Sequence, residues 1–212
     1  MSTLASALAQ LRLMANDTAT SHRVSPDSLQ QFADGVRTVF PASNKNLISP
    51  IKVSVAGGAL ASNTPTDAVF GLVTITPAPA LGATVDLYYN YQDYTDAEMQ
   101  TFLDSGLGEV GQTETTLSTI DVTLLTIACH YAAAMVNQDR MQRFAQQFNT
   151  STEGDSYEMS EVYKAYKAAK DGHETSAAEK RKAYYSRQDR SAVGYSTSTA
   201  KQYPPNPLFP RR

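Results

Sequence analysis

The chain has 212 residues, 42% of them hydrophobic, which suffices for one substantial folded unit with appendages but not for two full-sized domains. Its net charge of −3 hides an asymmetry: residues 1–155 carry seven basic and fifteen acidic side chains, and residues 156–212 carry eleven basic and six acidic ones. This polarity favours docking on a complementary surface or repeated contact between copies, although a solvated basic helix explains it as well. The single cysteine excludes an internal disulfide, and no apolar run is long enough for a membrane span. With no signal-like leader in residues 2–15, we expect a soluble protein used in a bacterial cytoplasm.

Two helices are expected before residue 41. Apolar residues recur at helical spacing over residues 2–16. A second helix is expected over residues 25–40, with Ser25 as its N-cap, Pro26 in its first turn and Pro41 after its end. Its apolar face would belong to the protein core.

The apolar period changes from 3.6 to 2 between residues 50 and 91. Alternating runs over 51–55, 69–75 and 85–91 predict three antiparallel strands, separated by glycines and prolines. Residues 59–67, rich in Ser, Asn, Thr and Pro, are expected to form an exposed loop.

The helical core follows the predicted strands. Thr95 and Glu98 form a capping-box pattern that begins a helix, which we expect to fray at Gly106, Gly108 and Gly111. The longest apolar run with helical spacing, over residues 116–148, predicts the central helix of the fold.

The C-terminal part is polar and basic. Asp155 and Glu158 mark another helix start, Asp171 and Gly172 suggest a break or a kink, and residues 176–187 are helix formers with little apolar material. From Asp189 the periodicity is lost, and no acidic residue follows, so we expect an extended tail that a partner orders.

Residues that could carry catalysis do not form a recognisable constellation. No P-loop, nucleophile elbow, dinucleotide fingerprint or zinc-ligand spacing occurs, and His22, His130 and His173 are dispersed along the chain, so we expect no metal, no cofactor and no enzyme activity. Cys129 and His130 are adjacent, but neighbours on a helix point about 100° apart, which favours a packed thiol over a nucleophile. Capping explains the acidic cluster better than a hard-cation site does. This cluster comprises Asp93, Asp96, Glu98 and Asp104.

Tyrosines gather in two places, and tyrosine is common where protein surfaces meet. A single-stranded nucleic-acid site is the alternative for the basic half, but the acidic overall charge favours a protein interface. The predicted subunit-interface residues are Tyr88, Tyr89, Tyr91, Tyr163 and Tyr166.

Residues 88–104 read YYNYQDYTDAEMQTFLD, and this segment resembles the helix start of tailed-bacteriophage head-to-tail connector adaptors. In that family a capped short helix precedes a long helix with small residues, here Ala128, Ala132, Ala133 and Ala134. The strands of residues 50–91 make a larger β element than the smallest adaptors carry.

The resemblance implies a virion-neck protein, assembled in the host cytoplasm. It forms a ring of identical subunits, usually twelve, which sits below the portal protein, binds the next neck or tail protein and lets genomic DNA pass through its channel. A C-terminal segment would reach the portal, with the acid-free, proline-rich end as the docking tail. The predicted docking residues are Tyr203, Pro204, Pro205, Leu208, Phe209, Arg211 and Arg212. Two alternatives stay open: another neck or tail-completion protein, and a nucleic-acid-binding accessory protein that uses residues 176–190.

The predicted fold class is α+β and mainly helical, a helix bundle with a long central helix, a three-stranded antiparallel β insertion, and an extended C-terminal helix and tail. The predicted divisions are N-terminal helices (1–49), the β element (50–94), the helical core (95–154), a basic C-terminal helix (155–190) and the docking tail (191–212).

Overall fold

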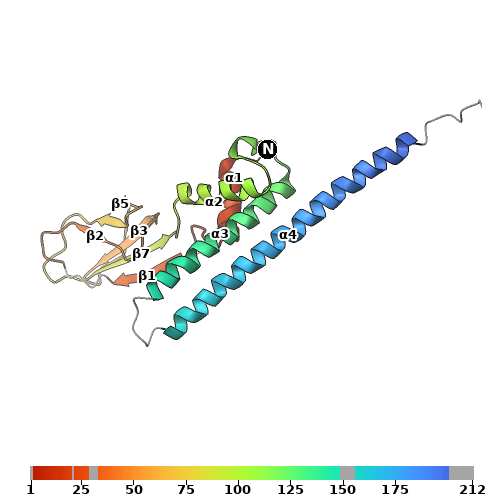
Figure 1. Cartoon of the computed structure of the whole chain (residues 1–212). Coiled ribbons are helices and arrows are strands. Elements are labelled where there is room, and N and C mark those ends of the chain that lie inside the picture. The colour runs from red at the N-terminus through yellow and green to blue at the C-terminus, as the bar shows by residue number, and fades with distance from the viewer. Residues whose placement is uncertain (1, 21, 29–32, 149–155, 201–212) are drawn as a thin grey trace, which may run out of the picture.

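The computed structural model describes residues 2–20, 22–28, 33–148 and 156–200, and it is α+β, as the sequence predicts. Small antiparallel sheets form one end of the body and helices form the other, while the longest helix continues past the helices it packs on (Figure 1). The helices are α1 (Leu4–Met14), α2 (Asp96–Glu109), α3 (Val122–Phe148) and α4 (Ser156–Ala200), with a short 3-10 helix η1 (Glu114–Thr116) before α3.

The first helix forms as the sequence predicts. Thr3 caps α1, because its hydroxyl accepts a hydrogen bond from the Ser6 amide and the Ser6 hydroxyl accepts one from the Thr3 amide. Ala7 and Leu11 are fully buried on one face of the helix. α1 therefore contributes an apolar stripe to the helical core.

The predicted second helix, over residues 25–40, is wrong. The chain instead forms two strands there, and Val24 and Asp27 pair with Tyr89 and Leu87 across a bulge that contains Pro26. Phe40, 1% exposed, belongs to the core of the sheets. In the described part of this range, residues 25–28 and 33–40, the chain forms no helix, because long-range strand pairing overrides local propensity.

Strands occur in two sheets rather than in the predicted three-stranded one. The order is β1-β7-β3-β4 in one sheet and β2-β6-β5 in the other, all antiparallel. The strands are β1 (His22–Ser28), β2 (Val39–Pro41), β3 (Leu47–Val55), β4 (Ala61–Asn63), β5 (Pro65–Asp67), β6 (Leu72–Thr74) and β7 (Val85–Tyr91).

Each of the three predicted strands exists, but the second of them, β6, pairs with β2 and β5 and not with the other two. Residues 59–67 hold β4 and β5, so the prediction of a loop there is wrong. The β part of the chain thus begins at His22, well before the predicted boundary at residue 50.

The second helix begins as predicted and ends later. The Thr95 hydroxyl accepts from the Glu98 amide, and the Glu98 carboxylate accepts from the Thr95 amide at 2.7 Å. Gly106 does not fray the helix but is buried against α3, where a Cβ atom would overlap the Ala128 carbonyl oxygen. The helix ends only before Gly111, which has a φ of +69°.

α3 is the central helix, since α1, α2 and α4 all pack on it. It begins at Val122 rather than near residue 116, because η1 and a turn precede it. Its buried residues include Ile127, Ala128, Ala132 and Val136, and small side chains let α2 approach closely. Phe102 and Leu124 pack against this same core; Phe32, which we expected there as well, lies outside the described residues.

α4 runs beside α3 as one unbroken helix (Figure 1), so the predicted break at Asp171 and Gly172 is wrong. Tyr166, Ala177 and Tyr184 lie on its α3-facing side, and this stripe continues across the glycine. The helix reaches Ala200, so residues 191–200 are helical and not part of an extended tail.

Candidate functional site

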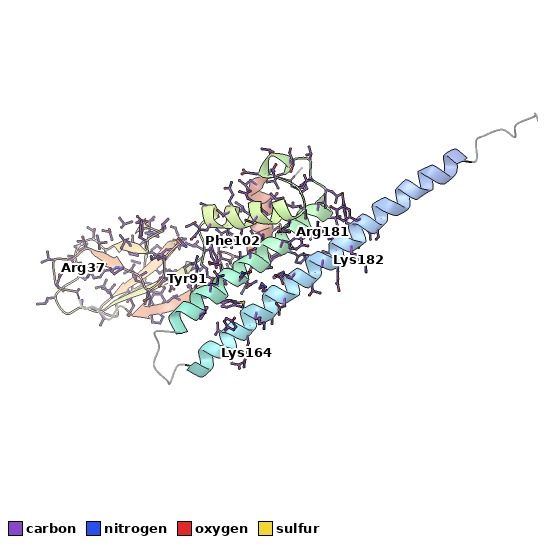
Figure 2. The ribbon with its side chains drawn as sticks, in the orientation of Figure 1. Arg37, Tyr91, Phe102, Lys164, Arg181 and Lys182 are labelled. Atoms are coloured by element: carbon purple, nitrogen blue, oxygen red, sulfur yellow. The ribbon has the colours of Figure 1, made fainter. Side chains whose placement is uncertain are left out.

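A cavity of about 350 Å³ lies where β1 and β7 meet α3 and α4. Tyr91, at the end of β7, marks this junction of sheets and helices (Figure 2). The wall is both aromatic and charged. It is lined by His22, Asn44, Tyr91, Asp93, Tyr94, Arg140, Arg143, Phe144 and Tyr166.

Arg12 of α1 connects three parts of the chain beside this cavity. Its guanidinium donates to the Asp17 carboxylate at 2.7 Å and to the Asp96 carboxylate at 2.7 Å. It also donates to the Tyr94 carbonyl oxygen at 3.1 Å. Because Arg12 is only 7% exposed, these bonds supply the partners that a buried guanidinium needs.

Arg140 of α3 also connects separate parts of the chain beside this cavity. It donates to the Ala15 carbonyl oxygen at 2.6 Å and to the Asp93 carboxylate at 2.7 Å. Its guanidinium carbon lies 5.6 Å from the centre of the Tyr94 ring and 5.5 Å from that of Tyr166. Arg140 therefore holds α1, α3, α4 and the segment after β7 together.

Asp17 is fully buried at the centre of these bonds. Burial raises the pKa of its carboxyl above the usual range, and the negative charge of Asp93 acts in the same direction. The Asp93 amide, which donates to Asp17 at 2.6 Å, and the charges of Arg12 and Arg140 oppose this rise in pKa. Asp17 is thus a costly buried group that the two arginines stabilise.

Asp17, His22 and Asp93 could each offer one ligand atom to a cation, because these atoms lie within 4.8 Å of one another. A cation would have to compete with Arg12 and Arg140, which already bond the two carboxylates. We therefore assign the cluster as a polar junction between sheets and helices, not as a metal centre.

Arg12, Asp17 and Arg140 were not predicted from the sequence. A signal was present for Arg12, which stands between Leu11 and Leu13 in an apolar helix without an acidic residue at helical spacing. The pairing of such residues across long sequence separations follows from tertiary structure alone.

The acidic residues considered as a cation site do not converge, and the capping interpretation is confirmed for Glu98. Asp93 bonds Arg140, while Asp96 bonds Arg12. Asp104 is exposed on α2, but partial desolvation and the negative charge of Glu114 raise its pKa.

The five predicted interface tyrosines have different environments. Tyr89 is 3% exposed, donates to the Asp27 carboxylate at 2.7 Å and accepts from the Asn44 amide at 3.1 Å. Burial and Asp27 raise the pKa of Tyr89 to about 12. Because Tyr89 is buried in the core of the sheets, it is not accessible for the predicted subunit interface. Tyr88 is half-buried on the opposite face of β7.

The other three tyrosines lie along the α3 and α4 side of the molecule. Tyr91 and Tyr166 line the junction cavity. Tyr163 is 39% exposed and lines a separate depression between α3 and α4. Tyr163 is therefore the predicted interface residue that is most accessible to a partner.

The predicted docking residues, Tyr203 to Arg212, lie outside the described residues.

His130 of α3 and His173 of α4 meet, contrary to the expectation of dispersed histidines. Their Nδ1 atoms are 3.1 Å apart, and His173 also has a hydrogen bond with the Met14 backbone. Burial lowers the pKa of both imidazoles; for His130 the charges of His173 and Lys180 lower it further. A hydrogen bond between two Nδ1 atoms requires at least one neutral ring.

Cys129 is fully buried and its thiol faces the Ala7 carbonyl oxygen at 4.0 Å. Burial raises the pKa of the thiol to about 12, which keeps it protonated at neutral pH. Because only a thiolate is a good nucleophile, a buried and protonated Cys129 is unsuited to nucleophilic catalysis. This supports the interpretation of Cys129 as a packed thiol.

A groove runs along α3 and α4 on the side away from α1. It consists of a depression of about 250 Å³ near Tyr163 and one of about 350 Å³ near Tyr131. Gln138 lines both, so the two depressions adjoin along α3.

Comparison with known proteins finds no matching family model, no matching curated protein and no matching solved structure. Among the described residues, no helix has both the length and the apolar character that a membrane crossing requires.

Proposed function

We propose that the chain is a non-catalytic structural protein of a tailed-bacteriophage virion. In this proposal it is a head-to-tail adaptor, assembled in the host cytoplasm, that forms a ring below the portal protein in the virion neck. Twelve copies are expected. The ring joins head to tail and lets genomic DNA pass through its channel without sequence-specific binding.

The observation that carries the proposal is the projection of α4 beyond its own body (Figure 1). Among the side chains of α4 that the structure describes, which end at Arg187, Tyr184 is the last to pack on the helical core, yet the helix continues to Ala200. Sixteen residues of helix extend for about 24 Å. Because an isolated helical segment of this length is marginal in water, a partner at this end would stabilise it.

The sequence after Ala200 fits the same role. Tyr203, Leu208 and Phe209 stand among prolines, which lower the entropic cost of ordering an extended segment in a groove. Weak contacts of single tails add up when identical subunits form a ring. The helix and the tail would together form one arm that reaches the portal.

The environment of the reactive groups supports a structural role. The Cys129 thiol is buried, and the carboxylates beside the junction cavity bond Arg12 and Arg140. The bonds of Arg12 and Arg140 to these carboxylates connect elements of the fold.

Two truncations test the arm. One ends after Ala200 and removes only the tail; the other ends after Asp189 and also removes the last part of α4. Both should keep the melting temperature of the full chain, because neither removes a side chain of the described core. Both should fail to join filled heads to tails when added to heads that lack the protein.

A failure confined to the shorter protein would place the portal contact on α4 itself. If both truncated proteins join heads to tails at normal yield, the arm hypothesis is wrong. Another neck or tail-completion protein would differ in the partner that the arm binds, and full-length protein would then bind tails rather than portal-containing heads.

A nucleic-acid-binding accessory protein is a second candidate function, favoured by the exposed Lys180, Lys182 and Arg187 of α4. Binding of this kind weakens steeply with salt, because each neutralised phosphate releases counterions. DNA titrations at 50 and 200 mM salt would show such a slope, whereas an adaptor should bind free DNA weakly at both.

A further inference from the structure

The outer face of α1 is an uncharged ridge. Ala5, Ala9 and Leu13 are exposed at a spacing of four residues, and Leu13 is 72% exposed. The one charged residue of α1, Arg12, is buried and bonds Asp17 and Asp96. A row of side chains at i, i+4 and i+8 is the kind of ridge that packs into a groove on another helix.

The α3–α4 groove is suited to such a ridge. Its floor and walls include Tyr131, Met135, Met141 and Ala145 of α3 and Tyr163 of α4. Between Tyr131 and Ala145 it extends for about 21 Å, and the eleven residues of α1 span about 16 Å.

The charges at the groove are already balanced within the chain. Lys170 pairs with Glu174 at 3.1 Å. The pKa of Arg181 is raised chiefly by its hydrogen bond with Tyr131, and the negative charge of Glu109 raises it further. An uncharged ridge can therefore cover the groove without leaving an unpaired charge in a desolvated interface.

The ridge cannot reach the groove of its own chain, because α1 and the groove lie on opposite sides of α3. Gln10 bonds Thr126, and the Cys129 thiol faces Ala7, which places α1 on one side. Nine residues, about two and a half turns, separate Thr126 from Met135 and Cys129 from Gln138. Met135 and Gln138 therefore project from the opposite side of the helix and line the groove.

We propose that the occupant of the groove is a second copy of this chain, whose α1 ridge packs between α3 and α4. Because ridge and groove are different surfaces on opposite sides, the contact is heterologous and repeats from copy to copy, which closes a ring when the rotation permits. The inference names the subunit contact of the proposed ring and rests on that function.

Paired cysteines test the contact, since the only native cysteine, Cys129, is fully buried. The full-length double variant Leu13→Cys with Gln138→Cys should give a ladder of covalent oligomers under mild oxidation. An equal mixture of the two single variants should give dimers that contain one copy of each, and nothing larger. The matched control is Leu81→Cys with Gln138→Cys; Leu81 is 81% exposed but lies in the β part of the chain, so no ladder should form.

A second variant, Leu13→Asp, should abolish self-association at concentrations where the unaltered protein assembles, with an unchanged melting temperature because Leu13 is exposed. Dimers from Leu13→Cys alone would indicate a symmetric α1 contact and overturn the inference, and so would a double variant without a ladder. The proposed function is judged separately: protein that joins heads to tails but gives no ladder would leave the adaptor intact and refute only this contact.

Discussion

At the scale of single residues, substitution of Ile127 is the most direct test of packing in the helical core. It is fully buried among side chains of α1, α2 and α3, so Ile127→Ala removes apolar contacts and leaves a cavity. We expect the free energy of unfolding to fall by about 2–5 kcal/mol, measured by urea denaturation. The matched control is Val122→Ala, in the same helix but 71% exposed, which should change it by less than about 0.5 kcal/mol. Equal effects at the two positions would contradict the orientation of α3.

The His130–His173 pair predicts a pH dependence of stability. Both pKa values are lowered in the folded protein from 6.5, so below about pH 6.5 the unfolded chain binds more protons than the folded one. The free energy of unfolding should therefore fall as the pH falls from 6.5 through the folded-state pKa values. Above pH 6.5 both states are neutral at these positions and this contribution stays constant.

Urea denaturation at several pH values between 8 and 5 measures this effect. The double variant His130→Gln with His173→Gln removes both titrating groups but keeps polar side chains between α3 and α4. Its stability should depend less on pH in this range than that of the unaltered protein. Parallel curves for the two proteins would show that the histidines do not have lowered pKa values.

Sequence patterns predict a residue's role where its partners are close along the chain. Thr95 and Glu98 are three residues apart, so their mutual capping could be predicted and is confirmed. Arg12 and Asp96 are far apart in sequence, as are His130 and His173, and only the folded chain brings them together. The same limit applies to Tyr89, since sequence alternation cannot tell which face of a strand is covered by a second sheet.

At the scale of elements, replacing either of two glycines of α2 by alanine should have opposite effects on stability. A Cβ at Gly106 would overlap the Ala128 carbonyl oxygen and press on Ala132 of α3, whereas a Cβ at Gly108 would meet nothing within 4 Å. Gly106→Ala should cost about 1–3 kcal/mol, because neither backbone can move without disturbing the core. Gly108→Ala should be neutral or stabilise by up to about 1 kcal/mol through helix propensity.

Melting curves of the two alanine variants measure this difference directly. A stabilised Gly106→Ala variant would mean that α2 does not approach α3 as closely as the structure has it.

Elements with local signals could be predicted, and those defined by long-range pairing could not. Caps and apolar periodicity mark the starts of the helices α1 and α2, and alternating apolar residues mark the strands β3 and β7. β1 contains Ser25 and Pro26, which predict a helix start, and β2 contains Phe40, which predicts a helical face; both form strands because β7 and β6 pair with them. α4 stays helical through Gly172 because it packs along α3, which local propensity does not take into account.

At the scale of the whole molecule, the described residues form two separate apolar cores, one within the sheets and one within the helices. The arginine network around Asp17 connects the segment after β7 with the helices, and α3 with α4 provides a long, partly uncovered surface. We interpret the sheets as an appendage, the helices as the part that contacts neighbouring copies, and α4 as the arm toward the portal.

The location of the chain in virions is the most direct test of the proposed adaptor. Virions purified from the phage to which the proposal assigns the chain would be treated with a gold-labelled antibody against the β part of the chain and viewed by electron microscopy. The adaptor function predicts label at the junction of head and tail, and none along the capsid or the tail. Virions that contain no copy of the chain, or label confined to the tail tip or the capsid surface, would contradict it.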